Sequence, residues 1–135
     1  MNETFQKKLE ELDKLNLPKN DYAVTGSGPL AIRNLRAADD IDVVVRRDLW
    51  ELLIKKYPPY DEHHVRVGNV DIWGDFFHLT HRMDEIIDNS ELIEGYRFVT
   101  LEDTLSWKKF LNREKDQKDI ALIKTHLQKE SVTAS

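Results

Sequence analysis

Two aspartates stand two residues apart at the start of an apolar run. Asp40 and Asp42 flank Ile41 and lead into the valines at 43–45. Side chains two apart on a strand share one face, with Cα atoms ~7 Å apart, so both carboxylates can reach one hard cation such as Mg²⁺. Aspartate is depleted in strands, so its presence here needs a reason. On this spacing alone, a strand with an exposed polar face is the simpler interpretation, because such short motifs recur by accident.

Asp71 adds a third carboxylate. It stands between Val70 and Ile72 and therefore points to the face opposite these apolar neighbours. If this segment pairs beside residues 41–45, Asp71 joins the acidic cluster. Three close carboxylates repel one another unless a cation or protons neutralise them. The alternative, a solvent-facing aspartate on a hairpin, becomes the weaker one once the other two carboxylates are counted.

A Gly-Ser-Gly turn at 26–28 precedes the aspartates. It leaves a predicted strand at 22–25 and enters a short helix predicted at 29–35. Such a turn presents backbone N–H groups that suit a phosphate. The spacings of a Walker loop and of a dinucleotide fingerprint are absent, and by itself the segment indicates only a turn.

The order of these features resembles the polymerase-beta-like nucleotidyltransferase superfamily. That order is a strand, Gly-Ser, a short helix, a basic residue, Asp-x-Asp in a hydrophobic strand, and a lone Asp in a later strand. Within the superfamily the sequence looks like the small stand-alone bacterial and archaeal members, which include antibiotic nucleotidyltransferases and toxin–antitoxin transferases. The match spans about residues 20–127. The resemblance implies transfer of a nucleoside monophosphate from a nucleoside triphosphate, with ATP favoured, to a hydroxyl, with release of pyrophosphate.

The resemblance also implies roles for individual residues. Gly26 and Ser27 would hold the nucleotide phosphates. Asp40 and Asp42 would bind two Mg²⁺ ions. Asp71 would ligate the catalytic metal and assist deprotonation of the acceptor hydroxyl.

Two further positions matter to the resemblance. Arg36 matches a basic position common in such proteins, and we expect it to bind nucleotide. Asp39 departs from the Thr or Ser often found just before the aspartate pair. We expect this departure to alter local hydrogen bonding more than activity.

The C-terminal stretch resembles the pattern that follows the catalytic sheet of these proteins, beginning with Leu-Glu-Asp at 101–103. By resemblance, Lys108 or Lys115 would contact the triphosphate, and Asp116 or Asp119 would orient the lysine. A lysine ammonium offsets charge on departing pyrophosphate. The other interpretation is a helix N-terminus in which Asp116 complements the dipole and Lys115 is solvated. Both interpretations stay open.

Charge limits the acceptor without identifying it. The formal net charge of −5 argues against a protein that coats nucleic acid. Residues 105–135 hold seven basic and four acidic groups, net +3, which leaves −8 on the remainder. The acceptor could be a small molecule, a tRNA end or a protein hydroxyl.

Two other functional classes remain. The first is a non-catalytic or partner-dependent protein of the same fold, such as a toxin–antitoxin component that acts by binding. We expect these 135 residues not to include the large helical acceptor-binding domain of bigger relatives, so that a homodimer or a partner protein could supply the missing wall. The second is a structural domain with scattered aspartates.

Bulk composition favours one cytoplasmic domain over residues 1–135. There are no cysteines, hydrophobic residues make up 40%, and no apolar run approaches the about 20 residues of a membrane-spanning helix. We expect a catalytic core at about 20–100, C-terminal helices at about 101–128 and a flexible tail at 129–135.

The hydrophobic pattern predicts an α+β fold, with a small mixed β-sheet flanked by helices and followed by C-terminal helices. Asp48 and Glu51 have capping-pair spacing, Thr100 opens a capping box, and Gly68-Asn69 forms a hairpin turn with positive φ angles. The predicted helices are 3–15, 29–35, 49–57, 82–88, 101–112 and a final one carrying Ile120, Ile123 and Leu127. The predicted strands are 22–25, 41–45, 65–67, 70–73 and an edge strand at 96–99.

The histidines and aromatic residues fit structural roles better than chemical ones. His63 and His64 are adjacent and would point to opposite faces of an extended chain, and no acidic residue is spaced to complete a zinc set. Trp107 is either core or a residue that narrows the pocket. The aromatic residues after Asp71 are more typical of core than of a base-stacking platform, although they could border an acceptor pocket: Trp73, Phe76 and Phe77.

Overall fold

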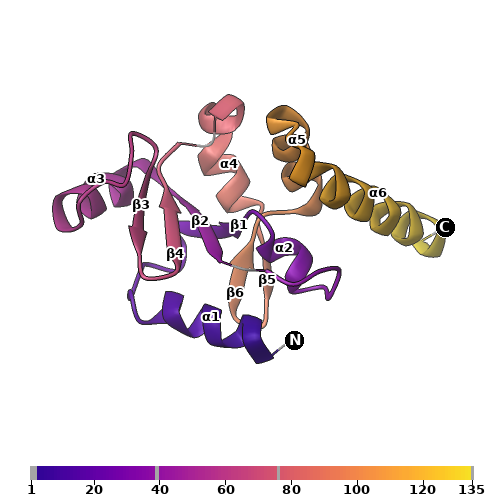
Figure 1. Cartoon of the computed structure of the whole chain (residues 1–135), viewed down its shortest axis with the longest axis horizontal. Coiled ribbons are helices and arrows are strands. Elements are labelled where there is room, and N and C mark those ends of the chain that lie inside the picture. The colour runs from indigo at the N-terminus through magenta and orange to yellow at the C-terminus, as the bar shows by residue number, and fades with distance from the viewer. Residues whose placement is uncertain (1–2, 39, 76, 135) are drawn as a thin grey trace.

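The described residues form six α-helices and a six-stranded mixed sheet, which confirms the predicted α+β class (Figure 1). The computed structural model describes residues 3–38, 40–75 and 77–134, without the side chains of 77, 78 and 131–134. The elements are α1 (Glu3–Asp13), β1 (Tyr22–Thr25), α2 (Gly28–Ala31), β2 (Ile41–Val45), α3 (Arg47–Lys56), β3 (His64–Val67), β4 (Val70–Trp73), the 3₁₀ helix η1 (Phe77–Arg82), α4 (Met83–Asp88), β5 (Glu91–Ile93), β6 (Tyr96–Phe98), α5 (Leu101–Leu111) and α6 (Glu114–Ala134).

The sheet has the strand order β3-β4-β2-β1-β6-β5. β2 pairs antiparallel with β1 and parallel with β4, while β1 pairs parallel with β6. β3–β4 and β5–β6 are antiparallel hairpins at the two edges. Residues 70–73 therefore lie beside residues 41–45, as the placement of Asp71 requires.

The two faces of the sheet bury different residues because successive side chains of a strand alternate. α1 and α3 cover one face, and α4 with α5 covers the other; Figure 1 shows α1 on the opposite side of the sheet from α4 and α5. The first face is packed with Phe5, Leu9, Leu12, Leu49, Leu53, Val24, Ile41, Val43, Val70 and Ile72. The second is packed with Ala23, Val44, Met83, Ile86, Ile87 and Trp107. Since Ile41, Val43 and Ile72 occupy the first face, Asp42 and Asp71 lie on the second.

The two C-terminal helices form a hairpin that packs on α2. Thr100 caps α5, because its side chain accepts a hydrogen bond from the backbone N–H of Asp103 at 3.2 Å, which confirms the predicted start. Asn112 ends α5 in the left-handed conformation, with a φ of 47°. Leu30, Leu101 and Ile123 form a small core where α2, α5 and α6 meet.

Three predictions about helices were wrong. Arg46, not Asp48, is the N-cap of α3, and the Glu51 carboxylate pairs with the Arg47 guanidinium at 3.2 Å instead of completing a capping box. α2 has four residues, fewer than predicted. α6 continues to Ala134 through the expected tail, because residues 128–134 contain no glycine or proline to stop a helix.

The strand at Tyr96–Phe98 is not an edge strand, because β5 pairs outside it. The hairpin that joins them turns at Glu94 and Gly95, whose φ angles are 53° and 86°. A two-residue turn with two positive φ angles usually carries Asn-Gly or Asp-Gly, so Glu-Gly gave a weak signal. In the other hairpin turn, only Gly68 has a positive φ.

Gly26 stands where β1 turns into α2, and we expect its replacement by Ala to destabilise the fold more than the same change at Gly68. The φ angles are similar, 68° and 62°, and each would cost an alanine roughly 1–2 kcal/mol. A Cβ at Gly26 would also lie 2.7 Å from Asp42 Oδ2, whereas at Gly68 no heavy atom lies within 4 Å. Urea unfolding of the two variants measures the difference. Equal losses would show that the turn does not press against Asp42.

Candidate functional site

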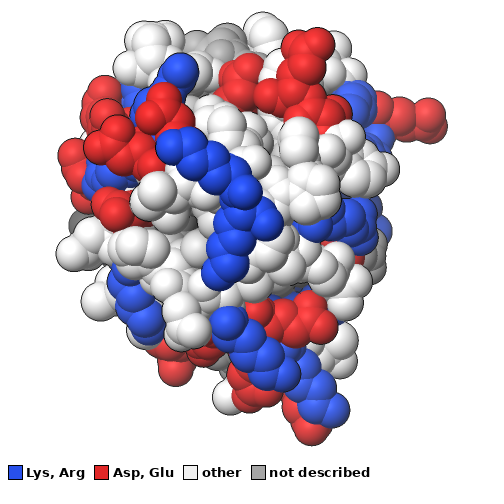
Figure 2. Space-filling view, turned by 90° about the vertical axis from the view of Figure 1, so that its left-hand side faces the viewer, with Lys and Arg blue, Asp and Glu red and all other residues white. Residues whose placement is uncertain are grey.

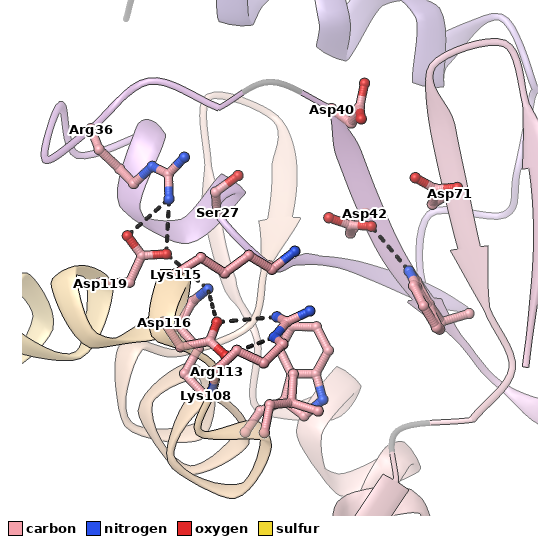
Figure 3. A pocket seen from close by; sticks show the side chains of 14 residues that line it. Ser27, Arg36, Asp40, Asp42, Asp71, Lys108, Arg113, Lys115, Asp116 and Asp119 are labelled. Carbon is pink, nitrogen blue, oxygen red and sulfur yellow. Dashed lines mark hydrogen bonds and ion pairs between the residues drawn. The ribbon is translucent and has the colours of Figure 1, made fainter.

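One pocket of about 560 Å³ is lined by all eight residues that the sequence singled out (Figure 3). It lies between the carboxylate face of β2 and β4 and the α5–α6 hairpin. The predicted residues along it are Gly26, Ser27, Arg36, Asp40, Asp42, Asp71, Lys108 and Lys115. Six others complete the lining: Trp73, Trp107, Leu111, Arg113, Asp116 and Asp119.

The acidic wall is built by strand register. β2 and β4 run parallel with Asp42 directly beside Asp71, so both side chains leave the sheet on the same face. Asp40 immediately precedes β2 and lines the same pocket. Gly26 lets the turn after β1 approach Asp42 closely, because it has no side chain.

The surroundings of Asp42 and Asp71 disfavour the ionised form of both carboxyl groups. Burial raises the pKa of Asp42, a hydrogen bond from Trp73 lowers it, and the charges of Asp71 and Asp40 raise it further, with a net rise. Burial also raises the pKa of Asp71, against opposing contributions from Arg66 and His64. Both groups are therefore harder to ionise than ordinary aspartates, which is the effect that a bound cation would relieve.

The acidic wall suits Mg²⁺ in ligand type. Its ligands would be carboxylate oxygens, and the buried Asp71 Oδ1 accepts no hydrogen bond from any described residue. However, among residues 3–38, 40–75 and 77–134, no group of three or more acidic or histidine side chains is arranged so that it could hold a metal ion. The donor chemistry fits, and a closed ligand set is not in place.

Arg66 is a neighbour of the site that the sequence interpretation missed. It lies on β3 directly opposite Asp71. Its guanidinium nitrogens are 3.7 Å from Asp40 Oδ2 and 3.9 Å from Asp71 Oδ2. It is the only described guanidinium within 4 Å of either carboxylate. The signal was available, since Arg66 follows the same strand alternation as Asp71.

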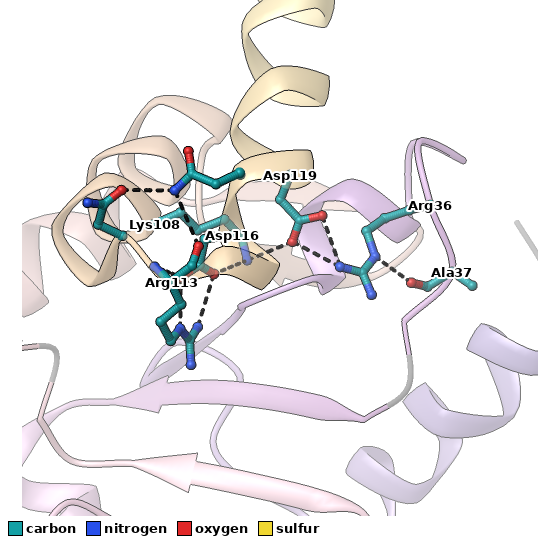
Figure 4. Close-up of polar contacts among 8 residues, drawn as sticks. Arg36, Ala37, Lys108, Arg113, Asp116 and Asp119 are labelled. Carbon is teal, nitrogen blue, oxygen red and sulfur yellow. Dashed lines mark hydrogen bonds and ion pairs between the residues drawn. The ribbon is translucent and has the colours of Figure 1, made fainter.

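The opposite wall is a chain of alternating charges (Figure 4). The Lys108 ammonium lies 2.9 Å from Asp119 Oδ2 and 3.7 Å from Asp116 Oδ1, and only 4% of Lys108 is exposed. Asp119 accepts from Arg36 Nη1 with both oxygens at 2.9 Å, and Asp116 accepts from Arg113 Nε at 2.8 Å. We call Arg36–Asp119–Lys108–Asp116–Arg113 the charge chain. It ties the loop after α2 to α5 and α6.

The charge chain distinguishes the roles of Lys108 and Lys115, which the sequence left open. Lys108 is buried between two carboxylates, so it braces the pocket wall. Lys115 is exposed, forms no ion pair within the described part of the chain, and extends into the pocket in Figure 3. Asp116 accepts from the backbone N–H of Arg113 at 3.0 Å, so it also caps the start of α6. Arg113 also lines the pocket, and it is the one of the four described lining cations that the sequence interpretation did not select.

The aromatic and histidine residues take several places. Trp107 belongs to the core of the second face, as one of the two interpretations held. His64 is buried and stacked on Trp73, while His63 Nδ1 lies 2.9 Å from Asp75 Oδ2. Asp39, Phe76 and the side chain of Phe77 lie outside the described residues.

Comparison with known proteins finds no protein-family model that matches the chain and no curated protein that matches it significantly in sequence. Among the described residues, no helix is both long enough and apolar enough to cross a membrane. The functional assignment therefore depends on the chemistry of the pocket.

Lys108→Met is expected to lower the free energy of unfolding by about 3 kcal/mol, because it leaves Asp116 and Asp119 buried with one cation fewer. Methionine keeps most of the side-chain volume, so packing changes little. The exposed neighbour Lys109→Met is the matched control, with an expected loss near zero. Urea unfolding at neutral pH measures both, and similar small losses would mean that the charge chain does not hold the hairpin.

Asp42→Asn is expected to raise the free energy of unfolding of the metal-free protein by roughly 1 kcal/mol at pH 7.5. The folded pKa of Asp42 is raised, so the ionised form opposes folding above that pKa, and the opposition is lost as the pH falls towards the unfolded value. The gain should shrink in urea unfolding at pH 5. The exposed Glu62→Gln is the control, and a gain that did not depend on pH would contradict the assignment.

Proposed function

We propose that the protein is a Mg²⁺-dependent nucleotidyltransferase that moves a nucleoside monophosphate from a nucleoside triphosphate to a hydroxyl. One observation carries the proposal. Asp42 and Asp71, paired in register on one sheet face, share a pocket with the Gly26-Ser27 turn and the cation Lys115. Carboxylates for a metal and cations for phosphate are the two requirements of this reaction.

The donor phosphates would lie between the two walls. The Ser27 side chain makes no capping hydrogen bond for α2, so its hydroxyl is available to a phosphate oxygen. Lys115 and Arg113 would offset the negative charge on the departing pyrophosphate. Lys108 and Arg36 would act differently from the original expectation: they hold the α5–α6 wall in place through Asp119.

The proposed reaction is a displacement at the α-phosphorus of the nucleoside triphosphate. The acceptor oxygen attacks the α-phosphorus, the bond from that phosphorus to the bridging oxygen of the β-phosphate breaks, and pyrophosphate leaves. The hydroxyl proton would pass to the Asp71 carboxylate, which lines the same pocket. Asp40, Asp42 and Asp71 would hold Mg²⁺ together with the phosphates, and the ion would supply positive charge to the phosphoryl oxygens.

For the base of the donor and for the acceptor, the proposal names classes of molecule and no single compound. ATP is the favoured donor on resemblance alone. Figure 2 shows Lys and Arg interspersed with Asp and Glu on the face it presents, without a continuous basic field. This is the side of α3, and it does not favour a long nucleic-acid contact; α6 lies on the far side. A small molecule, a tRNA end or a protein hydroxyl remain the candidate acceptors.

A second candidate is a binding protein of the same fold that needs a partner to complete its site. The observation that favours it is the lack, among the described residues, of a metal-holding set of three acidic or histidine groups. Such a protein would keep the carboxylates without transferring nucleotide by itself.

The test incubates the full chain with Mg²⁺, cell extract and ATP labelled either at the α- or at the γ-phosphate. The α-label should enter a product and the γ-label should leave as pyrophosphate, which separates this reaction from a kinase. Asp42→Asn should reduce product by at least about 100-fold, as expected for loss of a group that acts in the transition state. Glu62→Gln, outside the pocket, should not change it.

The same preparation should bind ATP only when Mg²⁺ is present, as measured by calorimetry. No labelled product with any nucleoside triphosphate, together with no Mg²⁺-dependent binding, would exclude the transferase. Mg²⁺-dependent binding without product in the extract would favour the partner-dependent protein.

A further inference from the structure

A stacked pair of aromatic rings contacts the two paired carboxylates, Asp42 and Asp71. His64 on β3 and Trp73 on β4 are direct cross-strand partners, and their ring centroids are 4.2 Å apart at an interplanar angle of 20°. His64 is 7% exposed. Trp73 also lines the pocket, in agreement with its possible place at the border of an acceptor pocket, whereas His64 was expected to be structural or solvated.

Each ring contacts one carboxylate. Trp73 Nε1 donates a hydrogen bond to Asp42 Oδ1 at 3.0 Å. His64 Nε2 lies 3.5 Å from Asp71 Oδ1, a close electrostatic contact without a hydrogen bond. Because Asp42 and Asp71 are themselves neighbours in β2 and β4, one rigid stack touches both members of the pair. A rotation of the Asp42 carboxylate would break the indole hydrogen bond.

The orientation of His64 is fixed from two further sides. The Tyr60 ring centroid lies 4.7 Å from that of His64, with the two rings tilted by 40°. Its Nδ1 is 3.0 Å from Asp61 Oδ2, while Asp61 Oδ1 accepts two backbone N–H groups at 2.7 and 3.0 Å. The Nδ1–Asp61 contact is an ion-pair distance without hydrogen-bond geometry, and Nε2 is the ring nitrogen that lies near Asp71.

We propose that the His64–Trp73 stack is a positioning device that sets the orientation of the Asp42 and Asp71 carboxylates for a divalent cation. The inference rests on the proposed function and adds two positioning residues to it. Neighbours that orient metal-ligating groups generally matter for affinity, and their loss weakens metal binding about 10–100-fold. The stack acts through the carboxylates and contributes no metal ligand of its own.

The test measures Mn²⁺ affinity of the full chain by calorimetry, with a non-hydrolysable ATP analogue present. Trp73→Phe keeps the stacked ring and removes the donor to Asp42. His64→Phe keeps a ring and removes both nitrogens. Each variant should weaken Mn²⁺ binding about tenfold or more. The electron paramagnetic resonance spectrum of the bound Mn²⁺ should also change, which a purely structural role would not cause.

Matched controls come from neighbouring rings. His63→Phe alters the adjacent histidine, and Trp50→Phe alters a tryptophan outside the pocket lining; both should bind Mn²⁺ like the wild type. Asp61→Asn serves if His64→Phe does not fold, because Asp61 is exposed and all rings remain. It should weaken Mn²⁺ binding in the same direction.

The outcomes separate the two proposals. Tight Mn²⁺ binding by the wild type with unchanged affinity and spectrum in Trp73→Phe and in the His64 or Asp61 variant would overturn the positioning role and leave the transferase intact. Absence of Mn²⁺ and nucleotide binding in the wild type would instead remove the proposed function, and the positioning role with it.

Discussion

The parallel pairing of β2 with β4 is the constraint on which the rest of the structure depends. It sets Asp42 beside Asp71 and, in the same register, sends Val43 and Ile72 into the core beneath α1 and α3. A slip of one residue would exchange the two faces, exposing the apolar side chains and burying the charges. The hydrophobic effect therefore fixes where two repelling carboxylates stand.

The two walls of the pocket are stabilised in different ways. The acidic wall is part of the sheet, and the packed core of the sheet offsets the repulsion between the Asp42 and Asp71 carboxylates. The opposite wall is held by the charge chain, in which buried Lys108 and buried Asp119 compensate each other and reach the loop after α2 through Arg36. Buried ion pairs add little net stability but cost much when one partner is lost. Their contribution here is the placement of α5 and α6 over the carboxylates.

Local pattern explains what could be predicted from sequence. Strand alternation placed Asp71, and the capping residue Thr100 placed α5. Non-local packing explains what could not. Sequence spacing does not predict that Lys108 rather than Lys115 pairs with Asp119. Both lysines lie near the turn between α5 and α6, and the rotation of each helix about its axis determines which one faces Asp119. Likewise β5, three residues long with an atypical Glu-Gly turn, gains its place only from pairing with β6.

The charge chain also constrains how the sequence can evolve. Asp116 and Asp119 are one helical turn apart on α6, and both must face Lys108 on α5. One residue inserted in the first turn of α6, before Asp116, would rotate both carboxylates by about 100° around the helix axis and away from the lysine. Surface turns usually accept insertions and deletions. The turn between α5 and α6 is constrained in composition, because Asn112 is left-handed and Arg113 belongs to the charge chain. We also expect natural variants to keep the length of the α6 segment before Asp116.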